Sequence, residues 1–255
     1  MAWQALYDQL SALPVAELSG SQSFFLKFCK AFLVGGRWKL YLQGLGFTLE
    51  LTVIALIIGI ILGVVVAVIR TSHDQQRLGR RNPALGFLNA VCKVYTTVIR
   101  GTPMVVQLLI LYYIVFASSS NGLAVATFSF GINSGAYVSE IIRGGIMSVD
   151  KGQMEAGRSL GLNYVQTMWF IIAPQVLKNV LPTLANEFIT LLKETSVAGY
   201  VAVCDLTFAG NRIRGVTYSA FMPLIAVALI YLILVTGLTW LVGKLERRLR
   251  KGDNR

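Results

Sequence analysis

Residues 45–69 read LGFTLELTVIALIIGIILGVVVAVI, and this stretch indicates whether the chain folds in water or in lipid. It is an almost unbroken run of Leu, Ile, Val and Gly, with one acidic residue, Glu50, near its start. A helix needs about 20 apolar residues to cross the hydrocarbon core of a bilayer. Residues 222–242 are equally apolar and precede a basic tail. Both stretches therefore predict membrane-spanning helices.

A third apolar stretch, residues 105–118, follows a mixed run of apolar and polar residues at 83–99. As one straight helix the two would be longer than a bilayer is thick. We therefore expect the helix to start at the cytoplasmic surface and to bend at Gly101 and Pro103, because proline disrupts the helical hydrogen-bond pattern.

Two weaker spans complete the set, at 123–147 and 180–203. Both contain charged side chains, which should face a partner or a water-filled cavity rather than lipid. These residues are Glu140, Arg143, Glu187, Lys193 and Glu194. The sequence thus predicts an all-α integral membrane protein with about five transmembrane helices. Gly59, Gly63 and Gly237 should allow close helix approach, either within the subunit or at a dimer face.

Composition supports the membrane assignment. The 255 residues are 55% hydrophobic and only 14% charged, and the mean hydropathy is +0.64. A net charge of +11 would suggest nucleic acid in a soluble protein. Here the basic residues cluster at the ends of apolar runs, where anionic lipid and the positive-inside rule account for them. Membrane lipid is therefore the expected partner, and nucleic acid is not.

The N-terminus carries Asp8 and Glu17 and lacks the basic and apolar regions of a cleaved signal peptide. Cys29, Cys92 and Cys204 are widely spaced in apolar surroundings, with no Cys/His cluster nearby, so we interpret them as packing residues. The first apolar span must then direct membrane insertion itself.

Orientation follows from the last span. Arg212 and Arg214 precede it, but six basic residues follow it between 244 and 255. The positive-inside rule places the C-terminus, including a tail at 251–255, in the cytoplasm. With five spans the N-terminus is outside, and the segment 148–178 is cytoplasmic.

Residues 1–43 form a separate extracytoplasmic or interfacial segment. Within it, residues 21–43 place paired Phe, Lys and Trp at roughly helical spacing. That pattern fits either an amphipathic helix lying on the outer membrane surface or a solvated lead-in to the first span.

Residues 148–178 read SVDKGQMEAGRSLGLNYVQTMWFIIAPQVLK, a connection far longer than two adjacent helices need. Residues 151–160 predict a short helix, and Gly161 can supply a left-handed C-cap. Asn163 can then N-cap a second helix that runs to Pro174. The segment is predicted to be a helix, a sharp turn and a helix facing the cytoplasm.

GQMEAGRSLGL followed by IIAPQVLKNVLP resembles the EAA loop of ABC importer permeases. The resemblance covers most of residues 44–250, through RGTPMVVQ at 100–107, AYVSEIIRGGI at 136–146, KETS at 193–196 and LERR at 245–248. It is similar to the polar amino acid branch of type I importers, which includes histidine and glutamine permeases. The resemblance implies that residues 44–250 form the transmembrane domain and that the loop is the coupling helix docking into a groove on the ATPase.

The resemblance also implies the rest of the complex: a second permease subunit, identical or different, two ABC ATPase subunits and an extracytoplasmic solute-binding protein. It places the chain in the bacterial cytoplasmic (inner) membrane as a multi-pass protein. We find no GxxxxGK[ST], HExxH or GxSxG motif. We therefore expect no catalytic residue, metal or cofactor in this chain, with ATP and Mg²⁺ bound by the partner ATPases.

The expected coupling residues lie in or beside the first helix of this loop: Gly152, Gln153, Glu155, Ala156, Gly157, Ser159 and Gly161. Glu155 suits docking against basic or donor groups. The family consensus has Ala where this chain has Gly157, and glycine lowers helicity by about 1 kcal/mol. We therefore expect the coupling helix to end early or to be more mobile.

The expected substrate-pathway residues are polar positions within the spans: Arg100, Thr102, Gln107, Glu140, Lys193, Glu194, Thr195 and Ser196. Lys193 or Arg100 would meet a substrate carboxylate, and Glu194 or Glu140 an ammonium group. Glu140 is also three residues from Arg143 on one helix, so a structural ion pair and a direct pathway role both remain open.

Other functions fit the sequence less well. A secondary transporter or channel would favour internal repeats and would not need a docking loop, and no repeat is visible. A membrane enzyme needs a convergent catalytic set, whereas His73, the one histidine, lies in a charged loop and is expected to be solvated. An ABC permease for another solute, such as an opine, remains an alternative.

Overall fold

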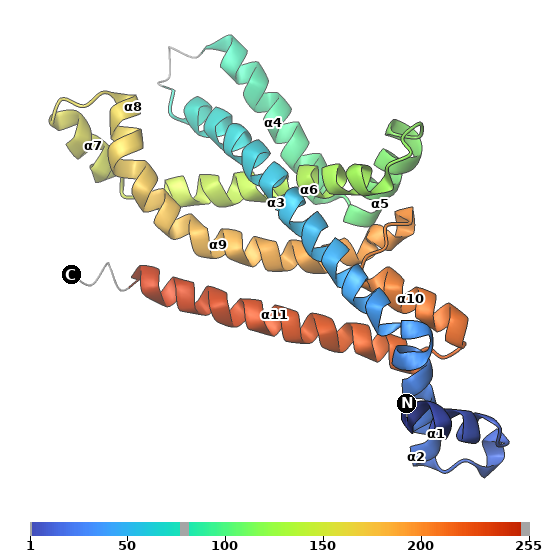
Figure 1. The fold of residues 1–255 in the computed structure, drawn as a ribbon. Coiled ribbons are helices and arrows are strands. Elements are labelled where there is room, and N and C mark those ends of the chain that lie inside the picture. The colour runs from blue at the N-terminus through green and yellow to red at the C-terminus, as the bar shows by residue number, and fades with distance from the viewer. Residues whose placement is uncertain (1, 77–81, 251–255) are drawn as a thin grey trace. The chain divides into compact units, whose positions relative to one another are not determined.

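The computed structural model describes residues 2–76 and 82–250, and these residues are helical with no strand among them (Figure 1). The α-helices are α1 Ala2–Ser11, α2 Gly20–Phe28, α3 Trp38–Asp74, α4 Pro83–Gly101, α5 Met104–Ile110, α6 Gly122–Met147, α7 Lys151–Ser159, α8 Tyr164–Thr167, α9 Ala173–Glu194, α10 Leu206–Thr217 and α11 Phe221–Arg250. The tighter and wider turns are η1 Val15–Glu17, η2 Cys29–Leu33, η3 Val34–Gly36, η4 Leu111–Val115, η5 Met168–Ile172 and η6 Thr195–Val201, of which η2, η4 and η5 are π-helical.

The chain divides into two compact units. The first comprises Met1–Leu49 and Ser196–Leu234, and the second comprises Glu50–Thr195 and Val235–Arg255. Helices α3 and α11 each contribute one part to each unit.

The first unit is built around an apolar core made by the beginning of α3, by α10 and by the beginning of α11. Its most buried members are Tyr41, Leu206, Ile213, Ala226 and Val227. Thr48 Oγ1 accepts a hydrogen bond from the Leu206 backbone N–H at 3.1 Å. This contact joins α3 to the N-terminus of α10 and fixes the two helices together.

The second unit contains α4 to α9, with α6 packed along α9 and against α4. Glycines let α3 approach α6 closely: a Cβ on Gly59 would lie 2.8 Å from Ser134 Cβ, and one on Gly63 would lie 2.5 Å from Val138 Cγ1. The predicted close approach within the subunit is therefore confirmed for these two glycines. At Gly237 no described residue lies within 4 Å of a Cβ, so close approach within the subunit is not seen there, and the dimer-face alternative stays a prediction.

Within the described part of the chain, two helices, α3 and α11, are long and apolar enough to cross a membrane. A third span results if the bent pair Pro83–Gly101 and Met104–Val115 is counted as one. The predicted total of about five stays a prediction.

The predicted bend before α5 is confirmed, since α4 and the following helix meet at 111° across Thr102 and Pro103. Gln107 Nε2 compensates the backbone there by donating to Ile99 O at 2.7 Å and to Thr102 O at 3.0 Å. The bend is thus held by a side chain that donates to Ile99 O, whose partner in an unbroken helix would be the N–H that Pro103 lacks.

Several local predictions are corrected. Residues 21–43 do not form one helix, because Gly35 and Gly36 adopt φ of +65° each and end the first helical segment before α3 begins. Cys204 is exposed rather than packed, while Cys29 and Cys92 are buried.

His73 is not simply solvated, because Asn89 of α4 lies 3.0 Å from its Nδ1. The basic residues Arg77, Arg80 and Arg81 and the expected tail at 251–255 lie outside the described residues.

Candidate functional site

The 148–178 segment folds as a capped helical corner formed by α7 and α8. Asp150 starts α7 by accepting a hydrogen bond from the Gly152 N–H at 2.6 Å. Asn163 starts α8 through a capping box with Gln166, in which each side chain accepts from the other's backbone N–H at 2.9 Å. The predicted helix, turn and helix are confirmed.

Gly161 makes the turn between them. It has a φ of +84°, in the left-handed region that favours glycine. The Gly161 N–H donates to Arg158 O at 3.0 Å, and the Leu162 N–H donates to Gly157 O at 3.2 Å. These two bonds are the pattern of a Schellman C-cap, which fixes the exit direction of the chain.

The second helix of the corner does not stop at Pro174, as the sequence had suggested. Helix α8 passes through the π-helical turn η5 into α9, and Pro174 lies in the first turn of α9. Proline is well tolerated there, because the first N–H groups of an α-helix need no partner within that helix. The helical path is therefore continuous from Tyr164 to Glu194.

Gly157 is a packing residue, and the expectation that it ends α7 early is wrong. Helix α7 continues two residues beyond it, to Ser159. Gly157 is buried, and a Cβ there would lie 2.5 Å from Thr167 Cγ2 and 2.9 Å from Ile171 Cδ1. The missing side chain lets α7 pack directly on the start of the second helix.

We predict that Gly157→Ala destabilises the corner by about 1–3 kcal/mol, because overpacking outweighs the better helix propensity of alanine. Limited proteolysis of the purified protein should show faster cleavage between residues 150 and 165. Adding Thr167→Ser should recover part of the wild-type resistance, since it removes the nearest clashing methyl group and keeps the hydroxyl that donates to Asn163 O at 3.0 Å, while the contact with Ile171 Cδ1 stays. Equal resistance of Gly157→Ala and wild type would contradict this packing role.

The outward surface of the corner combines polar and apolar groups. Gly152, Gln153, Glu155, Ala156, Ser159 and Gly161, all expected coupling residues, are exposed. Leu160 is 80% exposed and Val165 is 70% exposed. The sequence interpretation missed these two, although two large apolar residues in a polar loop were the available signal. Exposed apolar side chains in the same segment as an exposed carboxylate are suited to a protein partner.

A groove of about 360 Å³ lies behind this surface, between α7 and the end of α6. Its floor includes Ile146, Met154 and Met168, and Glu155 and Tyr164 line its polar edge. Partial burial raises the pKa of the Tyr164 phenol above its ordinary value, so the hydroxyl stays protonated at neutral pH and can donate a hydrogen bond.

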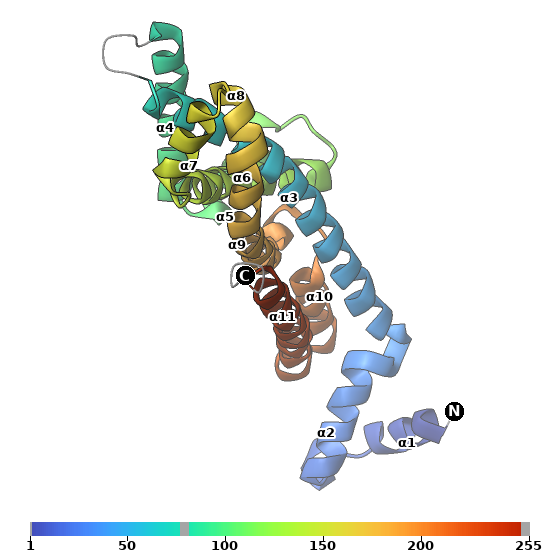
Figure 2. The same cartoon turned by 90° about the vertical axis from the view of Figure 1, so that its left-hand side faces the viewer.

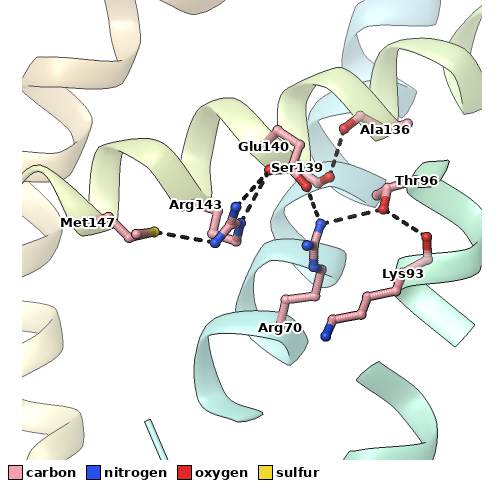
Figure 3. Close-up of polar contacts among 8 residues, drawn as sticks. All are labelled: Arg70, Lys93, Thr96, Ala136, Ser139, Glu140, Arg143 and Met147. Atoms are coloured by element: carbon pink, nitrogen blue, oxygen red, sulfur yellow. Dashed lines mark hydrogen bonds and ion pairs between the residues drawn. The ribbon is translucent and has the colours of Figure 1, made fainter. Parts of the chain in front are cut away.

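An ion-pair network joins residues of α3, α4 and α6 within the second unit (Figure 3). The predicted pair is confirmed: Arg143 donates to Glu140 Oε2 from Nε at 3.2 Å and from Nη2 at 3.1 Å. Arg70 of α3 pairs with the other carboxylate oxygen, Oε1, and also lies 3.4 Å from Thr96 Oγ1 of α4. Arg70 thereby joins α3 to α6 and α4, and both oxygens of Glu140 are occupied.

A cavity of about 560 Å³ adjoins this network and is rich in cations. Lys93, Arg100 and Tyr137 line it together with Arg70 and Glu140. The Arg100 guanidinium lies 5.4 Å from the centroid of the Tyr137 ring, a cation–π contact. Arg100 and Glu140 are thus brought to one cavity, as a substrate pathway would require.

Thr102 and Gln107 have partners within the chain. Gln107 Nε2 donates to Thr102 Oγ1 at 2.8 Å, and Asn133 Nδ2 donates to Gln107 Oε1 at 3.2 Å. These bonds give both residues a structural role at the α4–α5 bend, and their expected contact with substrate stays a prediction.

Helix α9 ends at Glu194 and η6 begins at Thr195, so the polar run at 193–196 is divided between two elements. Lys193 is exposed, whereas Thr195 is fully buried and donates to Leu192 O at 2.7 Å. One more carboxylate meets a polar partner, because Ser134 of α6 donates to Glu187 Oε1 at 3.1 Å. The sequence had noted Glu187 as a charge that should avoid lipid but had not placed it in the pathway.

Residues 81–251, which contain the capped corner and the ion-pair network except for Arg70, match the family model described as "Binding-protein-dependent transport system inner membrane component". The chain belongs to this family. Binding-protein-dependent inner-membrane components are multi-pass membrane proteins of transport systems, in agreement with the apolar helices α3 and α11.

Individual members of the family resemble this chain over most of its length. The arginine transport system permease protein ArtQ of Bacillus subtilis is 36% identical over 215 residues, which cover 83% of this chain and 93% of ArtQ. The glutamine transport system permease protein GlnP of Escherichia coli K12 is 38% identical over 64% of this chain and 76% of GlnP.

Two solved structures extend the likeness to the fold. A crystal structure of an amino acid ABC transporter with histidines has a chain that is 38% identical, with a TM-score of 0.74 over 82% of this chain and 94% of that one. A chain of the inward-facing MetNI methionine ABC transporter is 20% identical, with a TM-score of 0.70 over 83% of this chain and 97% of that one. This family member therefore has the fold of an ABC importer permease.

Proposed function

We propose that this permease imports polar amino acids, using ATP that is bound and hydrolysed, with Mg²⁺, by separate ATPase subunits. The observation that carries this proposal is the Schellman-capped corner of α7 and α8 within the family match. A rigid, solvent-exposed corner with a fixed exit direction suits a coupling element that receives a rigid-body movement. Its contact residues are the coupling set Gly152, Gln153, Glu155, Ala156, Gly157, Ser159 and Gly161, with Gly157 acting through packing.

The complete transporter contains a second permease subunit, two ATPase subunits and an extracytoplasmic solute-binding protein. A pair of permease subunits is physically reasonable, because few spans are available in one chain to enclose a pathway. In the proposed orientation the N-terminus is outside and the corner is cytoplasmic, in accord with the basic residues that follow the last span.

The substrate class rests on relatives named for arginine and glutamine transport and on an amino acid transporter of similar fold. Among the pathway residues, Arg100 lines a cationic cavity and is suited to a substrate carboxylate. Both oxygens of Glu140 already contact arginines, so we assign the substrate ammonium to Glu194 rather than to Glu140. Basic, neutral and acidic amino acids, and related solutes such as opines, are compatible with these residues.

We expect Lys193→Ala and Glu194→Ala each to abolish uptake while the complex still assembles, because both side chains are polar, neither is buried and they lie together at the end of α9. Uptake is measured in proteoliposomes that contain the full transporter, and assembly is measured by co-purification of the ATPase. We assign Thr195 no contact with the substrate, because its side chain is fully buried and donates to Leu192 O, and Thr195→Val is therefore the matched control. Uptake at the wild-type rate in either alanine variant would exclude the residue from the pathway.

ATP-dependent uptake with a panel of amino acids and opines tests the substrate assignment. A secondary transporter or channel would instead move solute along an ion gradient without the ATPase. Uptake that persists when the ATPase subunits are omitted would therefore contradict the proposed function.

A further inference from the structure

One face of α2 exposes two aromatic side chains. Phe24 and Phe28, one helical turn apart, are 58% and 40% exposed. The other side of the same segment is packed, with Leu26 and Cys29 buried. The segment therefore packs one face against its unit and leaves the aromatic face partly exposed.

This aromatic face is held firmly in the first unit. The Phe28 and Phe32 rings lie 4.8 Å apart between centroids, and Phe32 stacks on Tyr41 at 5.3 Å. Tyr41 belongs to the core and is only 3% exposed. A row of rings thus joins the exposed face to the core, so α2 is a fixed element and not a loose tail.

The beginning of α3 carries a second exposed apolar pair. Trp38 is 47% exposed and Leu42 is 58% exposed, again one turn apart. Figure 2 shows a bend between α2 and α3. Gly35 and Gly36, each with a φ of +65°, lie in the chain between these two helices. Tryptophan is enriched at the level of lipid headgroups, where its ring meets both apolar chains and water.

The surrounding charge is of one sign. Between Glu17 and Glu50 the sequence contains no acidic residue and four basic ones, Lys27, Lys30, Arg37 and Lys39. The three lysines are exposed, whereas Arg37 donates a hydrogen bond to the Lys30 carbonyl. Aromatic side chains next to lysines are the composition of helices that lie in a membrane surface.

We propose that Phe24, Phe28, Trp38 and Leu42 insert at the boundary between headgroups and acyl chains, and that Lys27, Lys30 and Lys39 bind the phosphates of anionic lipids. The positive charge without acidic neighbours matches an anionic lipid surface. Continuity with α3, which is long and apolar enough to span the membrane, brings the segment to that surface. In the orientation proposed above the surface is the outer leaflet, and the inference does not depend on the substrate or the ATPase.

The test places an environment-sensitive fluorophore at Phe24→Cys in full-length protein carrying Cys204→Ser, reconstituted in nanodiscs with or without phosphatidylglycerol. Cys29 and Cys92 are buried, and burial raises the pKa of the Cys29 thiol, so neither should compete for the label. Gln9→Cys, at an exposed polar position of α1, is the matched control. Gel filtration establishes that each variant is folded.

The label at position 24 should be blue-shifted and quenched by lipids that carry a quencher near the headgroup, and the label at position 9 should not. The shift should be larger with phosphatidylglycerol, and Lys27→Gln/Lys30→Gln/Lys39→Gln should remove that increase. Equal quenching of both labels by aqueous iodide would overturn the inference. So would protection of position 24 only after a solute-binding protein is added, because the face would then be a protein-docking surface.

Discussion

Glu155→Lys and Gly161→Pro are each expected to release the ATPase subunits from the detergent-solubilised transporter. Proline holds φ near −65°, whereas Gly161 has a φ of +84°, and proline also removes the N–H that donates to Arg158 O. A loss of about 3 kcal/mol at the corner would weaken association by about 100-fold. Glu155→Lys reverses the charge of an exposed residue of the proposed coupling set and should not alter the fold. Co-purification of the ATPase with tagged permease measures both effects.

Gly161→Asn is the matched control for the proline variant, since asparagine tolerates the left-handed conformation better than other side chains do. It should retain most of the bound ATPase. If Glu155→Lys and Gly161→Pro both carry the ATPase at the wild-type ratio, the coupling role of the corner is wrong.

Glu140→Ala is expected to destabilise the second unit strongly, because it leaves Arg70 and Arg143 without their shared carboxylate. The Arg70 and Glu140 side chains are 12% and 22% exposed, so the pair is partly buried. Removing one partner of a buried ion pair costs about 3–5 kcal/mol, and we expect the lower end, about 3 kcal/mol, for this pair. For a chain of this size that loss corresponds to a fall in melting temperature of roughly 6–12 °C in detergent.

A double-mutant cycle separates the ion pair from general packing. Arg70→Met/Glu140→Met should lose less stability than the sum of the two single variants, because the double variant removes both members of that pair. Glu17→Ala, at an exposed carboxylate, is the control and should leave the melting temperature unchanged. Strictly additive losses for Arg70 and Glu140 would contradict the network drawn in Figure 3.

Local chemistry made the corner predictable from sequence. A glycine after a short helix and an asparagine before the next one have few structural interpretations, and the structure gives φ of +84° at Gly161 and a capping box at Asn163. The Glu140–Arg143 pair could also be predicted, because its members are three residues apart on one helix.

Contacts between residues that are distant in the sequence could not be predicted in this way. Arg70 and Glu140 are 70 positions apart, and only the crossing of α3 and α6 brings them together. The same holds for Gly157, where helix propensity predicted a weakness but packing against Thr167 decided the outcome. Propensity describes an isolated helix, and here a neighbouring helix ten residues further along the chain overrides it.

The π-helical turn η5, Met168–Ile172, fixes the rotational phase of the path from Tyr164 to Glu194. A π-turn amounts to one extra residue in an α-helix, and one residue turns everything beyond it by about 100° about the helix axis. The direction in which Lys193 and Glu194 point relative to the capped corner therefore depends on these five residues, and also on Pro182 within α9. Restoring regular α-helical geometry at η5 would turn both side chains to another side of the helix axis.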